Sequence, residues 1–417
     1  MVAGLWLAFA VIRLLPLALT FDPSLYGDIS DPTGDVNRYE EWANQIVEAG
    51  LAPYSEVDIE YPPGALPFVV VPALLGSVGF SRPIFVALML ALDVVAFAVL
   101  LMLARRTRSY RGAVTWLLLP PLLGVLLYAR LDLIPAVALL LALERAHARG
   151  WLTSGLWLGL GAAAKLVPGL FLPLAFVAAH GRRVRLVAGA VVGGLVAWLP
   201  FAADPVELIG DVIGYHNARG IHLESIWGSV LNLQRISGGP QELEFEHGAF
   251  HITGPGDQAM LFWTTALSIA IVLLSLAIAV IRWRQRPQRA RLELPLAVTS
   301  TLALLLGTGR VFSPQFVIWL LAAAAVLFTV LPRVALWAGP LLVVIVVLTA
   351  VGYPLAFDLL RDGGRWPALV VLWRNIAVIA FGLMLLVRWL VGDRAAPVDE
   401  EDVSPGNEVV KYFTRHA

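Results

Sequence analysis

The sequence predicts an all-α polytopic membrane protein, and three observations support this fold class. Of its 417 residues, 59% are hydrophobic and only 14% are charged, whereas soluble domains carry about 25% charged residues. Apolar segments close to the ~20 residues that cross a bilayer recur from end to end of the chain. Arginines gather in some of the polar segments between them and are scarce in others, as in loops on opposite sides of a membrane. The chain has no cysteine, which excludes disulfides, thiolate metal sites and cysteine nucleophiles.

Residues 5–20 form the first apolar segment and are expected to remain as a membrane span. A cleaved signal peptide is the alternative, but no small-residue cleavage site follows and Pro16 interrupts the segment. A first external loop is placed at residues 21–83. Its stretch from residue 22 to residue 63 is strongly acidic, with Arg38 as its only basic residue. This stretch predicts a polar platform at the membrane surface.

Within the first loop, residues 35–49 predict a short amphipathic helix at the membrane interface. Its apolar residues recur at spacings of three and four and so share one face: Val36, Tyr39, Trp42, Ala43, Ile46 and Val47. Asp35 marks the helix start, because an aspartate accepts hydrogen bonds from the free first-turn amides, and Gly50 marks its end. Residues 64–76 are apolar but short and contain two prolines, so they predict a second interfacial segment.

Further apolar segments predict the remaining spans. They are residues 84–104, 113–128, 133–143, 151–164, 166–179, 186–203, 259–281, 294–306, 316–331, 334–356 and 368–391. Sized by the ~20-residue rule and oriented by the arginine-rich loops, they give about twelve spans with both termini cytoplasmic. If residues 64–76 crossed the membrane, the arginines that follow residue 104 would fall outside, which favours the interfacial interpretation.

A single transmembrane domain is expected at residues 1–391, with a second large external loop at residues 204–258. The tail at residues 392–417 is polar and is expected to be cytoplasmic and mobile. The sequence contains no visible tandem repeat and no separate soluble domain.

The predicted topology collects ionisable residues at the outer ends of the spans and in the two large loops. They are Asp35, Glu60, Arg130, Asp132, Lys165, His216, His222, Glu224 and Arg310. Charges near bilayer depth are costly and tend to face a cavity. The sequence therefore predicts an outward-facing cavity lined by carboxylates and a few cations. Asp93, in contrast, lies well inside a span and is expected to pair with a neighbouring helix.

The first loop resembles that of the GT-C membrane glycosyltransferases. The shared order is an acidic residue, a short amphipathic helix, Gly-x-x-Pro-Tyr at residues 50–54 and Glu-Tyr-Pro-Pro at residues 60–63. The chain is most similar to the polyprenyl-phosphate-mannose-dependent mannosyltransferases grouped as glycosyltransferase family 87, and to the mannosyltransferase family of glycolipid-anchor synthesis. The lysine in Gly-Leu-Gly-Ala-Ala-Ala-Lys-Leu-Val-Pro at residues 159–168 and the Ser-Pro-Gln at residues 313–315 agree with this resemblance, which covers most of the chain.

The resemblance implies a GT-C-like fold and a hexosyltransferase of the cell envelope. Its donor would be a polyprenyl-phosphate sugar, with mannose expected, and its acceptor a glycolipid or polysaccharide on the outer face of the membrane. Transfer would invert the anomeric carbon, and membrane lipid but no nucleic acid would be a partner. Such a displacement requires a base for the acceptor hydroxyl and positive charge for the departing phosphate.

Asp35 is the predicted base, and a plain helix N-cap is the alternative role for it. Lys165, Arg310 and Arg130 are predicted to bind the donor phosphate, although long basic side chains at span ends also snorkel toward water. The residues predicted to contact sugar or acceptor are Tyr39, Tyr54, Glu60, Tyr61, Asp132, His222, Glu224 and Gln315. For these the alternatives are interfacial anchoring by the tyrosines, a solvated Glu60, and an ordered structural loop around the histidines.

No cofactor is expected. Some relatives carry Asp-x-Asp at the start of the interfacial helix, whereas this chain has Asp35-Val36-Asn37. An amide is a poorer ligand for a hard cation than a carboxylate, so the sequence argues against a divalent metal. Asp28 and Asp31 are near enough in sequence to substitute as ligands, but turn residues beside a proline are more often simply solvated.

Two other functions are compatible with a protein of this class. A transporter or lipid flippase would carry charges along a transmembrane path and would often show related halves. Here the charges collect on one face and no repeat is visible. A scaffold for envelope assembly would not need the constellation around Asp35.

Overall fold

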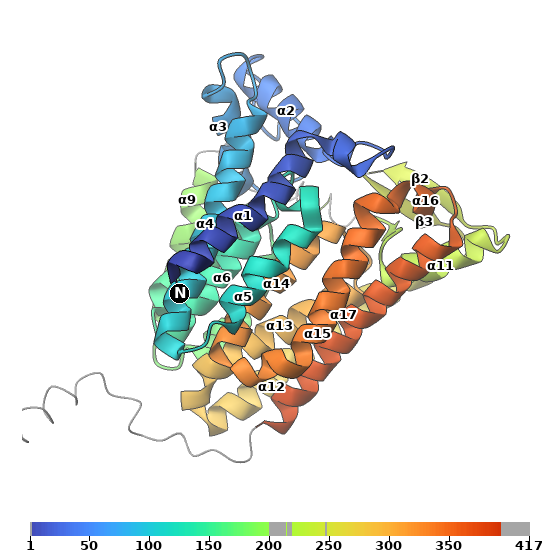
Figure 1. Cartoon of the computed structure of the whole chain (residues 1–417). Helices are drawn as coiled ribbons and strands as arrows, with labels where there is room; N and C mark the ends of the chain where they lie inside the picture. Colours follow the sequence, from blue (N-terminus) through green and yellow to red (C-terminus); the bar gives the residue numbers. More distant parts are fainter. Residues whose placement is uncertain (1, 200–213, 215–218, 247, 393–417) are drawn as a thin grey trace, which may run out of the picture.

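The computed structural model describes residues 2–199, 214, 219–246 and 248–392, and it is predominantly helical (Figure 1). Beyond residue 392, the tail that was expected to be mobile lies outside the described residues. The end of the predicted span at residues 186–203 and a part of the loop that follows it, including His216, also lie outside them.

Six helices in the described part of the chain are long and apolar enough to cross a membrane. They are α1 (Val2–Phe21), α4 (Arg82–Thr107), α12 (Asp257–Gln285), α13 (Ala290–Thr308), α15 (Pro332–Ala350) and α17 (Arg365–Val391). Short turns extend α13 at its start, through η6 (Pro287–Arg289), and α15 at its end, through η8 (Val351–Leu355). The chain is therefore a multi-span helical membrane protein. The other predicted crossings fall on shorter helices, so the total of about twelve spans stays a prediction.

The other helices in the described part of the chain are shorter than a bilayer crossing. They are α2 (Gly34–Val47), α3 (Leu66–Leu74), α5 (Arg111–Leu118), α6 (Leu133–His147), α7 (Trp151–Ala164), α8 (Leu172–Ala178), α9 (Arg183–Trp198), α11 (Ile226–Ile236), α14 (Val317–Val330) and α16 (Phe357–Arg361), with 3₁₀ turns at η1 (Pro23–Tyr26), η2 (Pro63–Ala65), η3 (Pro120–Leu127), η4 (Val167–Phe171) and η7 (Pro314–Phe316).

The prediction of one continuous helical span at residues 113–128 is wrong, because the helix is interrupted within this segment. The segment divides into α5 and η3 at Pro120-Pro121. Two successive prolines supply no backbone N–H donors and clash with the preceding turn, which ends an α-helix. Gly124 then has φ of 58°, a left-handed value that favours glycine. The break lets the chain reach residue 130 at the edge of the cavity described below.

Helix α14 forms the centre of the bundle. Every residue from Val317 to Thr329 is buried. A helix that is apolar on all sides is stable only when neighbours cover it on all sides, and α5, α6 and α13 do so here. Because α14 is held on all sides, the turn η7 that leads into it has a fixed position.

The amphipathic helix predicted in the first loop is confirmed as α2, and its position at the membrane interface stays a prediction. Its apolar face is buried at Val36, Tyr39, Trp42 and Ala43. The chain then turns at Gly50, where φ is 70°, as expected for a residue that ends a helix in the left-handed region. The segment after it is short, as predicted, because η2 and α3 together reach only from residue 63 to residue 74.

The all-α prediction missed a small antiparallel sheet in the second large loop. Its strands β1 (Ile221–His222), β2 (Glu242–Glu246) and β3 (Ala249–Thr253) lie in the order β1-β3-β2. His222 pairs with His251 across one ladder, and Phe245 with Phe250 across the other. The alternation Glu-Leu-Glu-Phe-Glu of β2 is the period-2 pattern of a strand. In Figure 1, α2 and this sheet lie toward one side of the molecule, and the last turn of α17 lies at the opposite end.

Candidate active site

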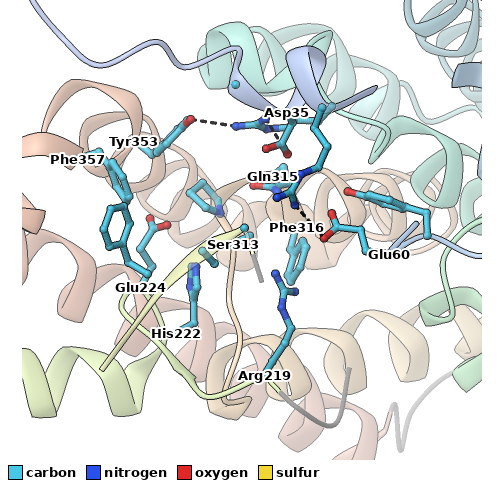
Figure 2. A pocket seen from close by; sticks show the side chains of 18 of the residues that line it. Asp35, Glu60, Arg219, His222, Glu224, Ser313, Gln315, Phe316, Tyr353 and Phe357 are labelled. Carbon is cyan, nitrogen blue, oxygen red and sulfur yellow. Dashed lines mark hydrogen bonds and ion pairs between the residues drawn. The ribbon is translucent and has the colours of Figure 1, made fainter. Parts of the chain in front are cut away.

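A cavity of about 360 Å³ opens where α2, the turn before α6, the sheet, η7 and η8 meet (Figure 2). Its walls combine residues from both large loops and from the ends of several helices of the bundle. The lining residues are Asp31, Gly34, Asp35, Arg38, Glu60, Tyr61, Pro62, Arg130, Lys165, Arg219, His222, Glu224, Phe245, Gly248, Ala249, Phe250, Ser313, Pro314, Gln315, Phe316, Tyr353 and Phe357. The predicted cavity lined by carboxylates and cations is therefore present.

Asp35 lies at this cavity, but it does not cap α2. The helix begins at Gly34, and Thr33 occupies the N-cap position. Asp31 organises the entry to the helix, since its Oδ1 accepts hydrogen bonds from the Thr33 amide at 2.8 Å and from the Thr33 hydroxyl at 2.6 Å. The N-cap alternative for Asp35 is therefore wrong, and its carboxylate is available for another role.

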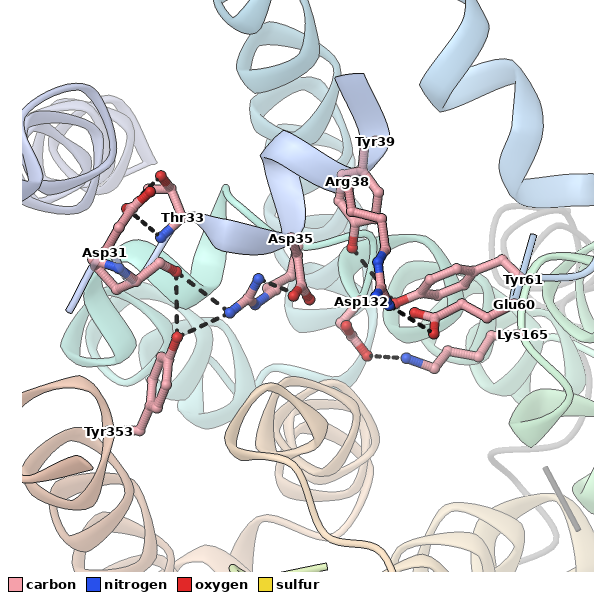
Figure 3. A network of polar contacts seen from close by, with 12 residues as sticks. Asp31, Thr33, Asp35, Arg38, Tyr39, Glu60, Tyr61, Asp132, Lys165 and Tyr353 are labelled. Atoms are coloured by element: carbon pink, nitrogen blue, oxygen red, sulfur yellow. Dashed lines mark hydrogen bonds and ion pairs between the residues drawn. The ribbon is translucent and has the colours of Figure 1, made fainter. Parts of the chain in front are cut away.

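The partner of Asp35 is Arg130. Arg130 Nη1 lies 2.7 Å from Asp35 Oδ2, and Arg130 Nη2 donates to the Tyr353 hydroxyl at 3.0 Å and to the Pro32 carbonyl at 3.3 Å (Figure 3). Burial acts to lower the pKa of Arg130, but the neighbouring Asp35 carboxylate raises it, and the net shift is upward. Arg130 as a whole is 6% exposed, so the cavity wall holds a buried positive charge.

Lys165 provides a second cation. Its Nζ lies 2.9 Å from Asp132 Oδ1 and within 5.1 Å of the ring centres of Tyr61, Phe316 and Trp319. Asp132 is completely buried and does not line the cavity. The structure therefore places Asp132 behind Lys165 as its ion-pair partner, and not where it would contact a sugar.

The predicted tyrosines divide into one that lines the cavity and two that support it. Tyr61 lines the wall beside Glu60, whose Oε2 lies 3.4 Å from Arg38 Nη1. Tyr54 donates its hydroxyl hydrogen bond to the Tyr61 carbonyl at 2.8 Å. Tyr39 is buried, with its hydroxyl 3.5 Å from that of Tyr61. Tyr39 and Tyr54 hold Tyr61 in place and do not themselves line the cavity.

His222 and Glu224 face the cavity from the segment that contains β1 (Figure 2). Burial, assisted by the charge of Arg219, lowers the pKa of His222 well below its usual range, so this imidazole is neutral at pH 7. Burial raises the pKa of Glu224 to about 7, although Arg374 and Arg130 oppose the shift. Glu224 is thus a carboxyl group that exchanges its proton near neutral pH, as acid–base residues of active sites often do.

Arg310 does not line the cavity, although Gln315 in the same loop does. The backbone carbonyl of Arg310 accepts a hydrogen bond from the His222 amide at 2.9 Å. Burial lowers the pKa of Arg310, and the positive charge of nearby Arg219 lowers it further. Arg219 lines the cavity on this side, and it was not among the predicted phosphate-binding residues.

Several other lining residues were not predicted as site residues, among them Arg38, Tyr353 and the aromatic side chains Phe245, Phe250 and Phe357. Arg38 could have been predicted as a site residue, since it is the only basic residue in the acidic segment at residues 22–63. Nothing in the sequence indicated Tyr353, because it lies in an apolar segment that was predicted to be a membrane span.

In the part of the chain that the structure describes, no group of three or more His, Asp or Glu side chains is arranged to hold a metal ion. The Asn37 side chain engages its neighbours, because its amide donates to Asp31 Oδ2 at 3.4 Å and its oxygen accepts from Arg82. That the reaction needs no metal ion stays a prediction from the sequence.

The cavity combines a partly exposed carboxylate, that of Asp35, with several cationic side chains in its lining. Asp35 retains 36% of its side-chain exposure, so a ligand can reach it, while Arg130, Lys165 and Arg219 present positive charge to the same space. A carboxylate can accept a proton from a hydroxyl group, and buried cations stabilise negative charge that develops on a departing group.

Comparison with models of protein families identifies a match. The model of glycosyltransferase family 87 matches residues 60–314, which is more than half of the chain. The matched region contains Glu60, Arg130, Lys165 and Glu224, whereas Asp35 lies before it. No curated protein was found to match the chain.

Proposed function

The chain belongs to glycosyltransferase family 87, and from this membership and the cavity we propose a specific reaction for a membrane glycosyltransferase. The enzyme transfers a sugar, with mannose expected, from a polyprenyl-phosphate donor to a glycolipid or polysaccharide acceptor. The observation that supports this proposal is the Asp35–Arg130 pair at 2.7 Å, because a carboxylate that can accept a proton there lies beside a buried cation that can bind a phosphate. Family membership favours a transferase over a transporter or a scaffold.

The proposed step is an inverting displacement. The oxygen of an acceptor hydroxyl attacks the anomeric carbon of the donor sugar and forms the new glycosidic bond. The bond from that carbon to the phosphate oxygen breaks, and its electron pair leaves with the polyprenyl phosphate. Asp35 takes the hydroxyl proton and later returns it to water.

Arg130 is proposed to couple donor binding to proton acceptance by Asp35. Its hydrogen bonds to the Pro32 carbonyl and the Tyr353 hydroxyl hold the guanidinium in place when a phosphate approaches. A phosphate that binds Arg130 competes with Asp35 for the guanidinium, so the Asp35 carboxylate is released toward the acceptor hydroxyl as the donor binds. Lys165 and Arg219 neutralise the remaining phosphate charge, with Arg310 behind Arg219.

The sugar is proposed to lie between Glu60 and Tyr61 on one side and His222, Glu224 and Gln315 on the other. The carboxylate, amide and imidazole groups can form hydrogen bonds with the sugar hydroxyl groups. The ring of Tyr61 offers an aromatic face for the sugar to stack on. Tyr39, Tyr54 and Asp132 act indirectly, through Tyr61 and Lys165.

A direct assay tests the reaction class. Purified protein in detergent is incubated with radiolabelled polyprenyl-phosphate mannose and a lipid extract of envelope membranes, and labelled glycolipid is sought by chromatography. Formation of a labelled product is expected. Transfer from a nucleotide sugar but from no polyprenyl-phosphate sugar would overturn the proposed donor class.

The cations of the cavity are expected to determine donor affinity. Lys165→Met and Arg130→Met should each weaken the binding of a short-chain polyprenyl-phosphate mannose by about ten- to a hundredfold, because a charge-assisted contact to phosphate contributes roughly 1.5–3 kcal/mol. Calorimetric titration in nanodiscs measures this change.

Two controls separate phosphate binding from damage to the fold. Lys165→Met leaves Asp132 without its partner, so the double variant Lys165→Met/Asp132→Asn should regain stability but not donor affinity. Arg310→Met, at a cation outside the lining, should have a much smaller effect. Wild-type affinity in both Lys165→Met and Arg130→Met would remove the cations from the donor site.

The active site is proposed to face the outer side of the membrane, with both termini cytoplasmic, because arginines crowd the loops at the other ends of the spans. Single cysteines at Thr107 and Gln288 should resist an impermeant thiol reagent applied to cells, whereas cysteines at Ser55 and Thr253 should react. Since the chain has no native cysteine, the background is clean. Labelling of Thr107→Cys from outside would reverse the proposed orientation of α4.

A further inference from the structure

Helix α17 carries a charged side chain inside the bundle. Arg374 is 1% exposed and its neighbour Asn375 is completely buried. A buried arginine is costly unless it is paired and hydrogen-bonded, so its contacts need an explanation. The guanidinium lies over the Phe312 ring, 4.2 Å from its centre, and it points toward the cavity wall formed by residues 222–225.

Both side chains bind the same backbone group. Arg374 Nη2 donates to the Glu224 carbonyl, and Asn375 Nδ2 donates to that carbonyl at 3.0 Å and to the Ser229 hydroxyl at 3.2 Å. Ser225 adds the helix cap that starts α11, since its hydroxyl accepts from the Gly228 amide at 2.9 Å. The backbone at Glu224 is therefore fixed from a transmembrane helix and from α11.

The Glu224 side chain itself is held more loosely. Its Oε1 lies 3.7 Å from Arg374 Nη1, which is an ion pair but is too long for a hydrogen bond. Among the described residues this buried oxygen has no hydrogen-bond partner, although Glu224, which is 3% exposed, lines the cavity. A buried acceptor without a donor is uncommon and costs stability, and a hydroxyl-bearing ligand would satisfy it.

We propose that Arg374 is a positioning residue that holds the Glu224 carboxylate in the cavity, ready to accept a hydrogen bond from a hydroxyl group of the transferred sugar. The inference rests on the proposed function for the identity of the ligand. The Arg374–Glu224 arrangement does not depend on it, so the two can be tested separately.

Other titratable groups surround Glu224 from every side. Arg374 from α17 and Arg130 from the turn before α6 act on its charge, and Glu224 in turn acts on Tyr353 of η8. His222 of the same segment lines the same cavity, and His251 of β3 pairs with His222. Arg374 and Arg130 both favour the ionised carboxylate, and burial opposes it. Loss of the Arg374 charge should therefore raise the pKa of Glu224 further and leave the group neutral at pH 7.

The experiment titrates Glu224 directly. Wild-type protein in nanodiscs is followed by infrared difference spectroscopy of the protonated-carboxyl band from pH 5 to pH 10, and Glu224→Gln assigns the band. Arg374→Met is expected to move the midpoint upward by about 1–3 pH units, the shift that an adjacent opposite charge produces. Asn375→Ala removes a bond to the same carbonyl without removing charge, so its midpoint should stay close to that of the wild type.

A second variant keeps the test decisive if Arg374→Met does not fold. Arg374→Lys keeps the positive charge, so the titration midpoint of Glu224 should stay near that of the wild type. A lysine cannot bind the Glu224 carbonyl and approach the Glu224 carboxylate together, so KM for the sugar donor should rise. The acidic limb of kcat/KM should follow the spectroscopic midpoint and disappear in Glu224→Gln.

The outcomes distinguish the two proposals. An unshifted midpoint in Arg374→Met, or wild-type KM in Arg374→Lys, would overturn the positioning role. A shifted midpoint in a protein that transfers no sugar from polyprenyl phosphate would support the arrangement and reject the proposed donor.

Discussion

Asp35→Asn is expected to lower the rate of sugar transfer by ~10²–10⁴, the range that general-base catalysis supplies, in a protein that still folds and binds its donor. Asp35 projects from the first turn of α2 into the cavity. Its carboxylate lies 2.7 Å from the Arg130 guanidinium. Asparagine keeps the shape of the side chain but cannot take a proton, so the variant removes the chemistry and little else. Single-turnover assays on monodisperse protein, with donor affinity measured in parallel, separate these effects.

The structure strengthens this test, because the start of α2 does not depend on Asp35. Thr33 occupies the N-cap position and Asp31 holds it, so a change at Asp35 should leave the helix intact. Asp28→Asn removes the same charge from the same loop without touching the cavity lining, and it should keep nearly full activity. Asp31→Asn should mainly loosen the entry to the helix, at a cost of about 1 kcal/mol.

Near-normal transfer by purified Asp35→Asn would exclude Asp35 as the base. Glu60 and Glu224 would then be the candidates, because both carboxyl groups line the cavity. Asp132 would not be one, since it is buried behind Lys165.

The fold was predictable where a local pattern determined it. The spacing of Val36, Tyr39 and Trp42 predicts an amphipathic helix, and these are the side chains that α2 buries. The pattern failed where apolar composition could not distinguish a straight helix from a broken one. Pro120-Pro121 was visible in the sequence, yet the segment was assigned to one span by its hydrophobicity. The sheet was missed for a related reason, since short strands inside a loop bury too little apolar surface to stand out.

The site was predictable as a set of residue types and not as a set of contacts. Asp35, Arg130 and Lys165 were all selected, and the cavity brings them together. Their pairing was not predictable, because residue 35 meets residue 130 only through the packing of α2 on the bundle. Arg310 and Arg219 lie close in space and far apart in sequence, and composition could not tell which of them reaches the lining. Tyr353 and Arg374 lie in apolar segments, where only the tertiary structure reveals their polar contacts.

One polar network lies away from the cavity and inside the bundle. The sequence predicted that Asp93 pairs with a neighbouring helix, and the structure confirms it: Arg13 Nε lies 2.8 Å from Asp93 Oδ2. Trp116 Nε1 and the Tyr128 hydroxyl each donate to the same carboxylate at 2.7 Å. Arg13 also donates to the carbonyls of Leu117 at 2.6 Å and Trp116 at 3.0 Å. The network joins α1, α4, α5 and η3, and none of its members lines the cavity.

Arg13→Met is therefore expected to destabilise the fold strongly and to leave catalysis by the folded protein unchanged. Removing one partner of a buried pair typically costs about 3–5 kcal/mol, because the other charge is left uncompensated. The double variant Arg13→Met/Asp93→Asn removes both charges and keeps an acceptor for Trp116 and Tyr128, so it should recover most of the loss, as coupled neighbours do in a mutant cycle. Unfolding by SDS titration in mixed micelles measures the stability, and kcat/KM per folded molecule provides the control. If Arg13→Met unfolds within about 1 kcal/mol of the wild type, this pair contributes no more than an exposed salt bridge, and the attachment of α1 to the bundle must depend on apolar packing such as the stacked rings of Phe9 and Phe97.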